Sequence, residues 1–103
     1  MDSSDMYAVI FKANFKDISQ LDAEYHALAK QLQGLAKEQY HCQNFVSTTE
    51  GNQEIAISYW SSLEHIKAWK NDPLHQIAQS KGMQQWYETY TVEIVEIVKS
   101  YSL

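Results

Sequence analysis

Residues 45–60, FVSTTEGNQEIAISYW, decide the fold of this chain. Both halves are rich in Val, Ile, Thr and aromatic residues, which favour strands, and residues 50–53, EGNQ, form a turn signal between them. The stretch therefore predicts a β-hairpin with strands in residues 40–49 and 55–60. Both faces of the second strand carry apolar bulk, which predicts that each face is covered. The alternating residues are Ile55, Ile57 and Tyr59 on one face and Ala56, Ser58 and Trp60 on the other.

The segment before the hairpin predicts a strand and a long helix. Met6–Phe11 is an apolar run of strand formers without alternation, which is typical of a strand covered on both faces. Apolar residues then recur at spacings of three and four from residue 18 to residue 37, which indicates an amphipathic helix. Asp17 or Ser19 can cap the N-terminus of this helix. The periodic residues are Ile18, Leu21, Tyr25, Leu28, Leu32 and Leu35.

Two helices and a final strand are predicted after the hairpin. Ser61-Ser62 is an N-cap signal for a short helix. Asn71-Asp72-Pro73 ends that helix and starts another, which runs from Pro73 to about Tyr87. Residues 89–98 are strand formers that are apolar on both sides. The buried side of the short helix consists of Leu63, Ile66 and Trp69.

The predicted order β-α-β-β-α-β is that of a ferredoxin-like α+β domain, with helices on one face of a four-stranded antiparallel sheet. The other face of the sheet has no helix left to cover it. A domain of 103 residues has a thin core, yet this one contains three Trp, seven Tyr and three Phe residues. We therefore expect a homodimer in which two sheets pack face to face.

Composition excludes several other classes of protein. The chain is one domain, residues 1–103, with a net charge of −5 and only eight Lys and Arg residues, which argues against nucleic-acid binding. It has no apolar run of about 18 residues, so no membrane span is expected. Residues 1–5 are polar and acidic, unlike a secretion signal, and are expected to form a flexible tail. Cys42 has no second cysteine to pair with, which fits a cytoplasmic protein.

The last predicted helix carries candidate functional residues on one side. At 100° per residue, His75, Gln79, Gly82 and Trp86 share a face that turns inward. Gly in a helix costs about 1 kcal/mol relative to Ala, and buried polar side chains need partners, so this face suggests a cavity or a close approach. The alternative is an ordinary core, in which His75 is half exposed and Gly82 only permits tight packing. The aromatic residues that fit either interpretation are Tyr59, Trp69, Trp86 and Tyr90.

The same region resembles a known family. Residues 59–70, YWSSLEHIKAWK, resemble the "YW-x-s-x-e-x-I-x-a-W" segment of the antibiotic biosynthesis monooxygenase (ABM) domain family. Residues 72–90 are similar to the "D-P-x-H-x-x-A-Q-x-x-G-x-x-x-W-Y-x-x-Y" signature of one bacterial branch. The resemblance implies a dimeric α+β barrel with a pocket between sheet and helices in each subunit.

The resemblance also implies a chemistry. Some members of the family oxidise polycyclic phenols or quinols with O₂ and without metal, flavin or haem, and others degrade haem. In the cofactor-free reaction a deprotonated substrate reduces O₂, and the protein supplies a base and an aromatic clamp. On this basis His75 is the expected catalytic base. The expected substrate-binding residues are Trp69, Trp86 and Tyr90 as the clamp and Gln79 and Asn14 as groups that orient oxygens.

Haem degradation is not expected, because Gln79 stands where the haem-ligating His lies in that branch, ten positions after Trp69. Metal-ligand spacing is also absent among His26, His41, His65 and Cys42. The resemblance thus implies, as one interpretation, a cofactor-independent monooxygenase of a small aromatic or quinol-like compound. The alternative is a non-catalytic, ligand-binding or stress-associated dimer of the same fold.

Overall fold

The computed structural model describes residues 6–103, so the tail expected at residues 1–5 lies outside the described residues. Four strands, three α-helices, a 3-10 turn and a π-helical turn follow one another along the chain. In chain order they are β1 (Tyr7–Phe15), η1 (Ile18–Gln20), α1 (Ala23–Gln39), β2 (Asn44–Glu50), β3 (Gln53–Trp60), α2 (Leu63–Lys70), α3 (Pro73–Lys81), η2 (Gly82–Trp86) and β4 (Tyr87–Glu96).

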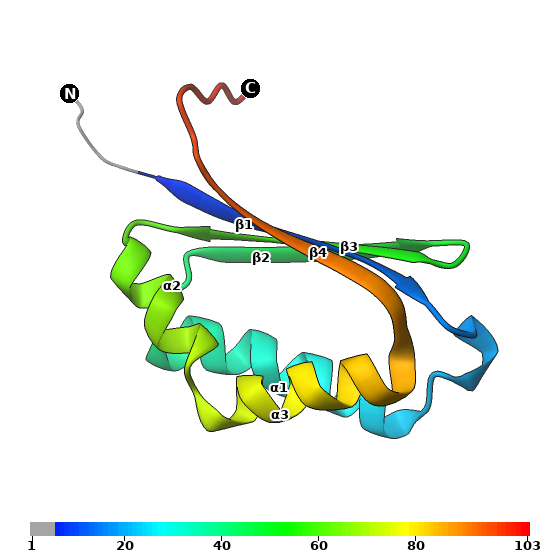
Figure 1. Cartoon of the computed structure of the whole chain (residues 1–103). Helices are drawn as coiled ribbons and strands as arrows, with labels where there is room; N and C mark the ends of the chain where they lie inside the picture. The colour runs from blue at the N-terminus through cyan, green and yellow to red at the C-terminus, as the bar shows by residue number, and fades with distance from the viewer. Residues whose placement is uncertain (1–5) are drawn as a thin grey trace.

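The strands form one antiparallel sheet in the order β2-β3-β1-β4. Figure 1 shows α1, α2 and α3 together on one face of this sheet, with the C-terminal segment leaving on the other side. This arrangement confirms the predicted ferredoxin-like α+β fold with its helices on a single face. No helix within residues 6–103 combines the length and apolarity that are needed to cross a bilayer.

The long helix begins later than predicted. Residues Ile18–Gln20 form the separate turn η1, in which the Asp17 side chain accepts from the backbone N–H of Ser19. Leu21 is extended, and the Asp22 side chain then accepts from the backbone N–H of Tyr25 as the N-cap of α1. The predicted start at Ile18 was wrong because two successive Asp caps divide the segment, although the apolar spacing continues across the break.

Two strand boundaries also differ from the prediction. Strand β1 continues to Phe15, four residues beyond the apolar run. Residues 40–43 were expected in a strand but connect α1 to β2, and His41 there has a φ of 65°. A left-handed residue interrupts a strand, and His is among the residues that tolerate this conformation.

Two separate clusters form the core between sheet and helices. One cluster contains Trp60 and Ile66 with Trp69, and the other contains Phe15 and Tyr25. Val9, Ala36 and Cys42 complete the first cluster, and Leu28 and Trp86 complete the second. The helices are therefore anchored to the sheet at two places.

Gly82 lies at the junction of α3 and the π-helical turn η2, where a side chain would not fit. A Cβ atom at this position would lie 2.7 Å from both Cδ2 and Cε2 of Tyr87, the first residue of β4. The φ of Gly82 is −58°, so its role is close packing and not an unusual backbone conformation. Close packing was one of the two roles that the sequence left open for Gly82, and the contact with Tyr87 agrees with it.

Substituting Gly82 with Ala tests this contact against a matched control. Helix propensity alone favours Ala over Gly by about 1 kcal/mol, but overpacking costs about 1–3 kcal/mol. We expect Gly82→Ala to lower the free energy of unfolding measured with urea. Gly34→Ala in α1 should raise it by up to about 1 kcal/mol, because nothing lies within 4 Å of a Cβ there. Equal stabilisation by both substitutions would contradict the close contact.

Candidate functional site

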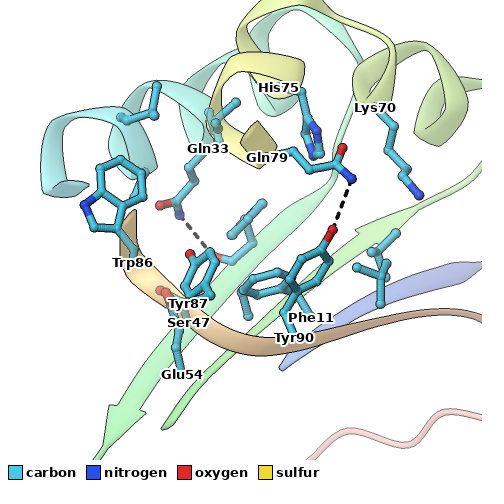
Figure 2. A pocket seen from close by; sticks show the side chains of 18 of the residues that line it. Phe11, Gln33, Ser47, Glu54, Lys70, His75, Gln79, Trp86, Tyr87 and Tyr90 are labelled. Carbon is cyan, nitrogen blue, oxygen red and sulfur yellow. Dashed lines mark hydrogen bonds between the residues drawn. The ribbon is translucent and has the colours of Figure 1, made fainter. Parts of the chain in front are cut away.

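A cavity of about 200 Å³ lies between the inner face of the sheet and helices α1 and α3. Residues of both core clusters line it, Trp69 from one and Tyr25 and Trp86 from the other. Figure 2 shows side chains from the helices and from the sheet pointing into this space. The cavity therefore lies between the two core clusters, where the helices do not pack against the sheet.

Five of the six predicted site residues line this cavity, and one does not. The five are Trp69, His75, Gln79, Trp86 and Tyr90. Asn14 lies on the opposite face of the sheet, where its Nδ2 donates to the Thr89 hydroxyl at 3.0 Å. Successive residues of a strand point to opposite faces, and Val9 and Phe11 of the same strand face the cavity. The structure therefore does not bring Asn14 together with the other five residues.

His75 and Trp69 form one end of the cavity. Their rings are in edge-to-face contact, with centroids 4.6 Å apart and planes at 78°. Trp69 Nε1 and His75 Nδ1 are buried, and neither has a hydrogen-bond partner within residues 6–103. A buried polar group left unpaired costs about 1–3 kcal/mol. Because both residues line the cavity, a ligand bound there is a candidate for the missing partner of these atoms.

The His75 side chain is held in its neutral form. Burial lowers the pKa of its imidazole from the ordinary 6.5, and the positive charge of Lys70 lowers it further. The backbone of His75 itself and the Asp72 carboxylate act in the opposite direction without cancelling the shift. At neutral pH the ring therefore has one nitrogen that can accept a proton.

Gln79 and Tyr90 meet at a solvent-exposed part of the cavity lining. Gln79 Nε2 donates to the Tyr90 hydroxyl oxygen at 3.1 Å, the contact dashed in Figure 2. The Tyr90 ring stacks on Phe11 with centroids 5.7 Å apart and planes at 30°. Phe11 and Tyr90 thus form an aromatic wall on the sheet side of the cavity. Gln79 of helix α3 holds the Tyr90 hydroxyl in place.

A polar cluster at the other end of the cavity was missed in the sequence. The Tyr25 hydroxyl donates to Glu54 Oε1, and the Tyr87 hydroxyl donates to the Tyr25 hydroxyl at 3.4 Å. The Trp86 ring is 5.1 Å from that of Tyr25. One signal in the sequence could have found this cluster: Glu54 follows the alternation of Ala56, Ser58 and Trp60, which places a carboxylate on the inward face of β3.

Burial sets the protonation of this cluster. It raises the pKa of the Glu54 carboxyl, and hydrogen bonding from Tyr25 and Tyr87 only partly opposes the rise. Burial likewise raises the pKa of Tyr25 well above its ordinary value, and that of Tyr87 to about 12. Both tyrosines are therefore neutral and can act as hydrogen-bond donors at physiological pH. Glu54 is the acidic group of the cavity.

The arrangement suits a flat, mainly apolar ligand with polar groups at its ends. Figure 2 shows His75 and Lys70 on one side of the cavity, and Glu54 and Tyr87 on the other. Aromatic side chains form much of the wall between them. Within residues 6–103 no group of three or more His, Cys, Asp or Glu side chains is placed to hold a metal ion.

Several solved structures share this fold. The chain superimposes on Rv0793 of Mycobacterium tuberculosis with a TM-score of 0.78 and 11% identity, covering 94% of this chain and 99% of that one. It also superimposes on a candidate antibiotic biosynthesis monooxygenase of Nitrosomonas europaea with a TM-score of 0.76 and 10% identity, covering 95% of each chain. For SnoaB of Streptomyces nogalater, a cofactor-independent oxygenase, the TM-score is 0.71 at 10% identity, with coverage of 95% and 97%. The chain thus has the ABM fold.

The nearer relationship is visible in the sequence. No family model matches the chain. The uncharacterised protein YqjZ of Bacillus subtilis is 35% identical over 92 residues, which cover 88% of this chain and 78% of the relative. This protein belongs to the same family as YqjZ.

Replacing Glu54 with Gln tests the electrostatics of the buried cluster. Because the folded state holds the Glu54 proton more tightly than the unfolded chain does, the ionised carboxylate lowers stability above its ordinary pKa of 4.5. We expect Glu54→Gln to have a higher Tm than the wild type at neutral pH and to lose that advantage below pH 4.5. The control is Glu50→Gln, an exposed carboxylate of β2. An equal effect of both substitutions at every pH would contradict the assignment.

Proposed function

We propose that this protein binds a small phenol- or quinol-like compound in the cavity and oxidises it with O₂ without a cofactor. The observation that carries the proposal is the pairing of a buried imidazole nitrogen and a buried indole N–H, both unpartnered within residues 6–103, in an aromatic-lined cavity. The relation in fold to SnoaB, a cofactor-independent oxygenase, is consistent with it.

The size of the cavity limits the substrate. An apolar cavity of about 150 Å³ in another protein takes up benzene, whereas this one measures about 200 Å³. One ring or two fused rings fit such a space. The polycyclic substrates of some ABM-fold enzymes would require it to expand.

The cavity residues suit the steps of a balanced reaction. With 1-naphthol, the reaction with O₂ gives 1,4-naphthoquinone and water. The O–H bond and the para C–H bond break, one oxygen atom enters the ring, and the other leaves as water with both hydrogens. Naphthol supplies all four electrons. Neutral His75 accepts the hydroxyl proton, and Trp69 Nε1 and the Lys70 ammonium stabilise the resulting naphtholate.

Oxygen uptake with a panel of naphthols and quinols, in the presence of a metal chelator, tests the reaction. We expect His75→Ala to lower turnover by about a hundredfold or more, which is the usual contribution of a general base. The control is His41→Asn. His41 is exposed and has a positive φ, and Asn also tolerates this conformation. Unchanged turnover in His75→Ala would remove the chemical role of His75. Ligand binding without any oxygen uptake would identify a non-catalytic binding protein.

We also propose that two copies pair through the sheet faces that the helices leave free. On this face Ile57 lies between its neighbours Ile10 and Val46, and Ala8 lies beside Val95. Val46 is 47% exposed and Val95 is 37% exposed in the single chain. An apolar patch of this kind on a small domain is typical of an interaction surface, and sheets commonly pack face to face.

The pairing predicts a mass of twice 12.0 kDa in solution. We expect Val46→Lys to shift the particle toward the single-chain mass, measured by light scattering at micromolar concentration, because it places a charge within the interface. Ile77→Lys is the matched control, since Ile77 is 51% exposed on helix α3. A folded wild type that stays at 12.0 kDa would refute the dimer.

A further inference from the structure

A partly buried carboxylate closes the end of the cavity away from His75. Glu54 lines the cavity from the inward face of β3, and the Tyr25 hydroxyl donates to its Oε1. An ionised carboxylate has about four acceptor positions on its two oxygens, so this bond uses only part of its capacity. The oxidation proposed above assigns no role to this group. The carboxylate can therefore accept a hydrogen bond from a ligand.

The two ends of the cavity differ in the charged group that they present, Lys70 at one end and Glu54 at the other. Trp69 Nε1 and the Lys70 ammonium, which both belong to residues lining the cavity, can only donate. Glu54 can accept a hydrogen bond. Hydrogen bonds of a ligand with these groups are stronger in the cavity than in water, because the local dielectric constant is lower. A ligand that satisfies both ends needs an acceptor at the Trp69 end and a donor at the Glu54 end.

Strand β3 sets the distance between these ends. Glu54 and Ser58 lie four residues apart, which at a rise of about 3.3 Å per residue is about 13 Å along the strand. Ser58 pairs with Phe45 of β2, and the Phe45 ring is 6.0 Å from that of Trp69. Side chains reach inward from both ends, so the free length suits one or two aromatic rings.

We propose that the cavity selects an aromatic compound with oxygen at both ends, and that Glu54 is the residue that determines this specificity. One oxygen is the ionisable group held at the Trp69–Lys70 end, and the other is a hydroxyl that donates to Glu54. The stacked rings of Phe11 and Tyr90 form a flat wall for the ring system between them. This inference rests on the proposed function for the aromatic nature of the ligand and adds its substitution pattern and orientation.

Three bicyclic probes separate the contributions to binding. They are 1-naphthol, 1,5-dihydroxynaphthalene and 5-methoxy-1-naphthol, the last of which fills the Glu54 end without offering a donor. Binding is measured without O₂ by quenching of tryptophan fluorescence, since Trp69 and Trp86 line the cavity. Because a hydrogen bond to a charged acceptor is strong, we expect the diol to bind the wild type about tenfold more tightly than either other probe.

Variants of Glu54 identify the source of this preference. We expect Glu54→Gln to reduce the preference for the diol to about threefold, because a neutral amide oxygen is a weaker acceptor. Glu54→Met, which has no such acceptor, should abolish it, so that the diol and 1-naphthol bind this variant with equal affinity. Glu50→Gln, on an exposed part of β2, should keep the full preference.

The outcomes distinguish this inference from the proposed function. Tight binding of all three probes with equal affinity would overturn the role of Glu54 and leave the aromatic cavity intact. A diol preference that survives in Glu54→Met would also overturn it. If no probe binds, both the inference and the proposed function fail. The expected pattern without any oxygen uptake in aerobic assays would support the inference and refute only the oxidation.

Discussion

The structure depends on two aromatic clusters that anchor the helices to one face of the sheet. Trp60 and Trp69 pack tilted at 5.3 Å between centroids at one end, and Trp86 packs edge-on to Tyr25 at 5.1 Å at the other. Such large rings need room, and between the two clusters the helices do not reach the sheet. The cavity is the consequence. The cavity removes dispersion contacts from a domain whose core is already small, and so it reduces stability. The two aromatic clusters on either side hold its walls in place.

The polar groups in the cavity also reduce the stability of the fold. A core selected for stability alone would contain neither an unpaired indole N–H and an unpaired imidazole nitrogen nor a partly buried carboxylate. Trp69, His75 and Glu54 all face this one space, although they come from α2, α3 and β3. Local violations of good packing tend to concentrate at functional sites, and these three meet in the cavity, whereas the unpartnered Nδ1 of His65 does not line it. Gly82 belongs with them, because its missing side chain lets Tyr87 enter the wall.

Much of the site could be predicted because it lies on one helical stripe. His75, Gln79 and Trp86 share a face through spacings that any α-helix imposes, and the π-helical turn at residues 82–86 did not move Trp86 out of the cavity. Asn14 could not be placed in this way. Its face depends on the register of β1, and the strand extends beyond the apolar run from which its direction might have been judged. Glu54 was predictable from alternation, but a single carboxylate at a strand end usually points to solvent.

The sequence by itself determined the order of the elements, the caps at Ser62 and Asp72 and the helical side that carries His75. These features are local: capping and periodicity involve residues a few positions apart, whose relative geometry the backbone imposes. Only the tertiary structure decided that Tyr25, Glu54 and Tyr87 meet. Those contacts join segments 29 and 62 residues apart, and they depend on strand register and on the packing of whole elements, which no local pattern specifies.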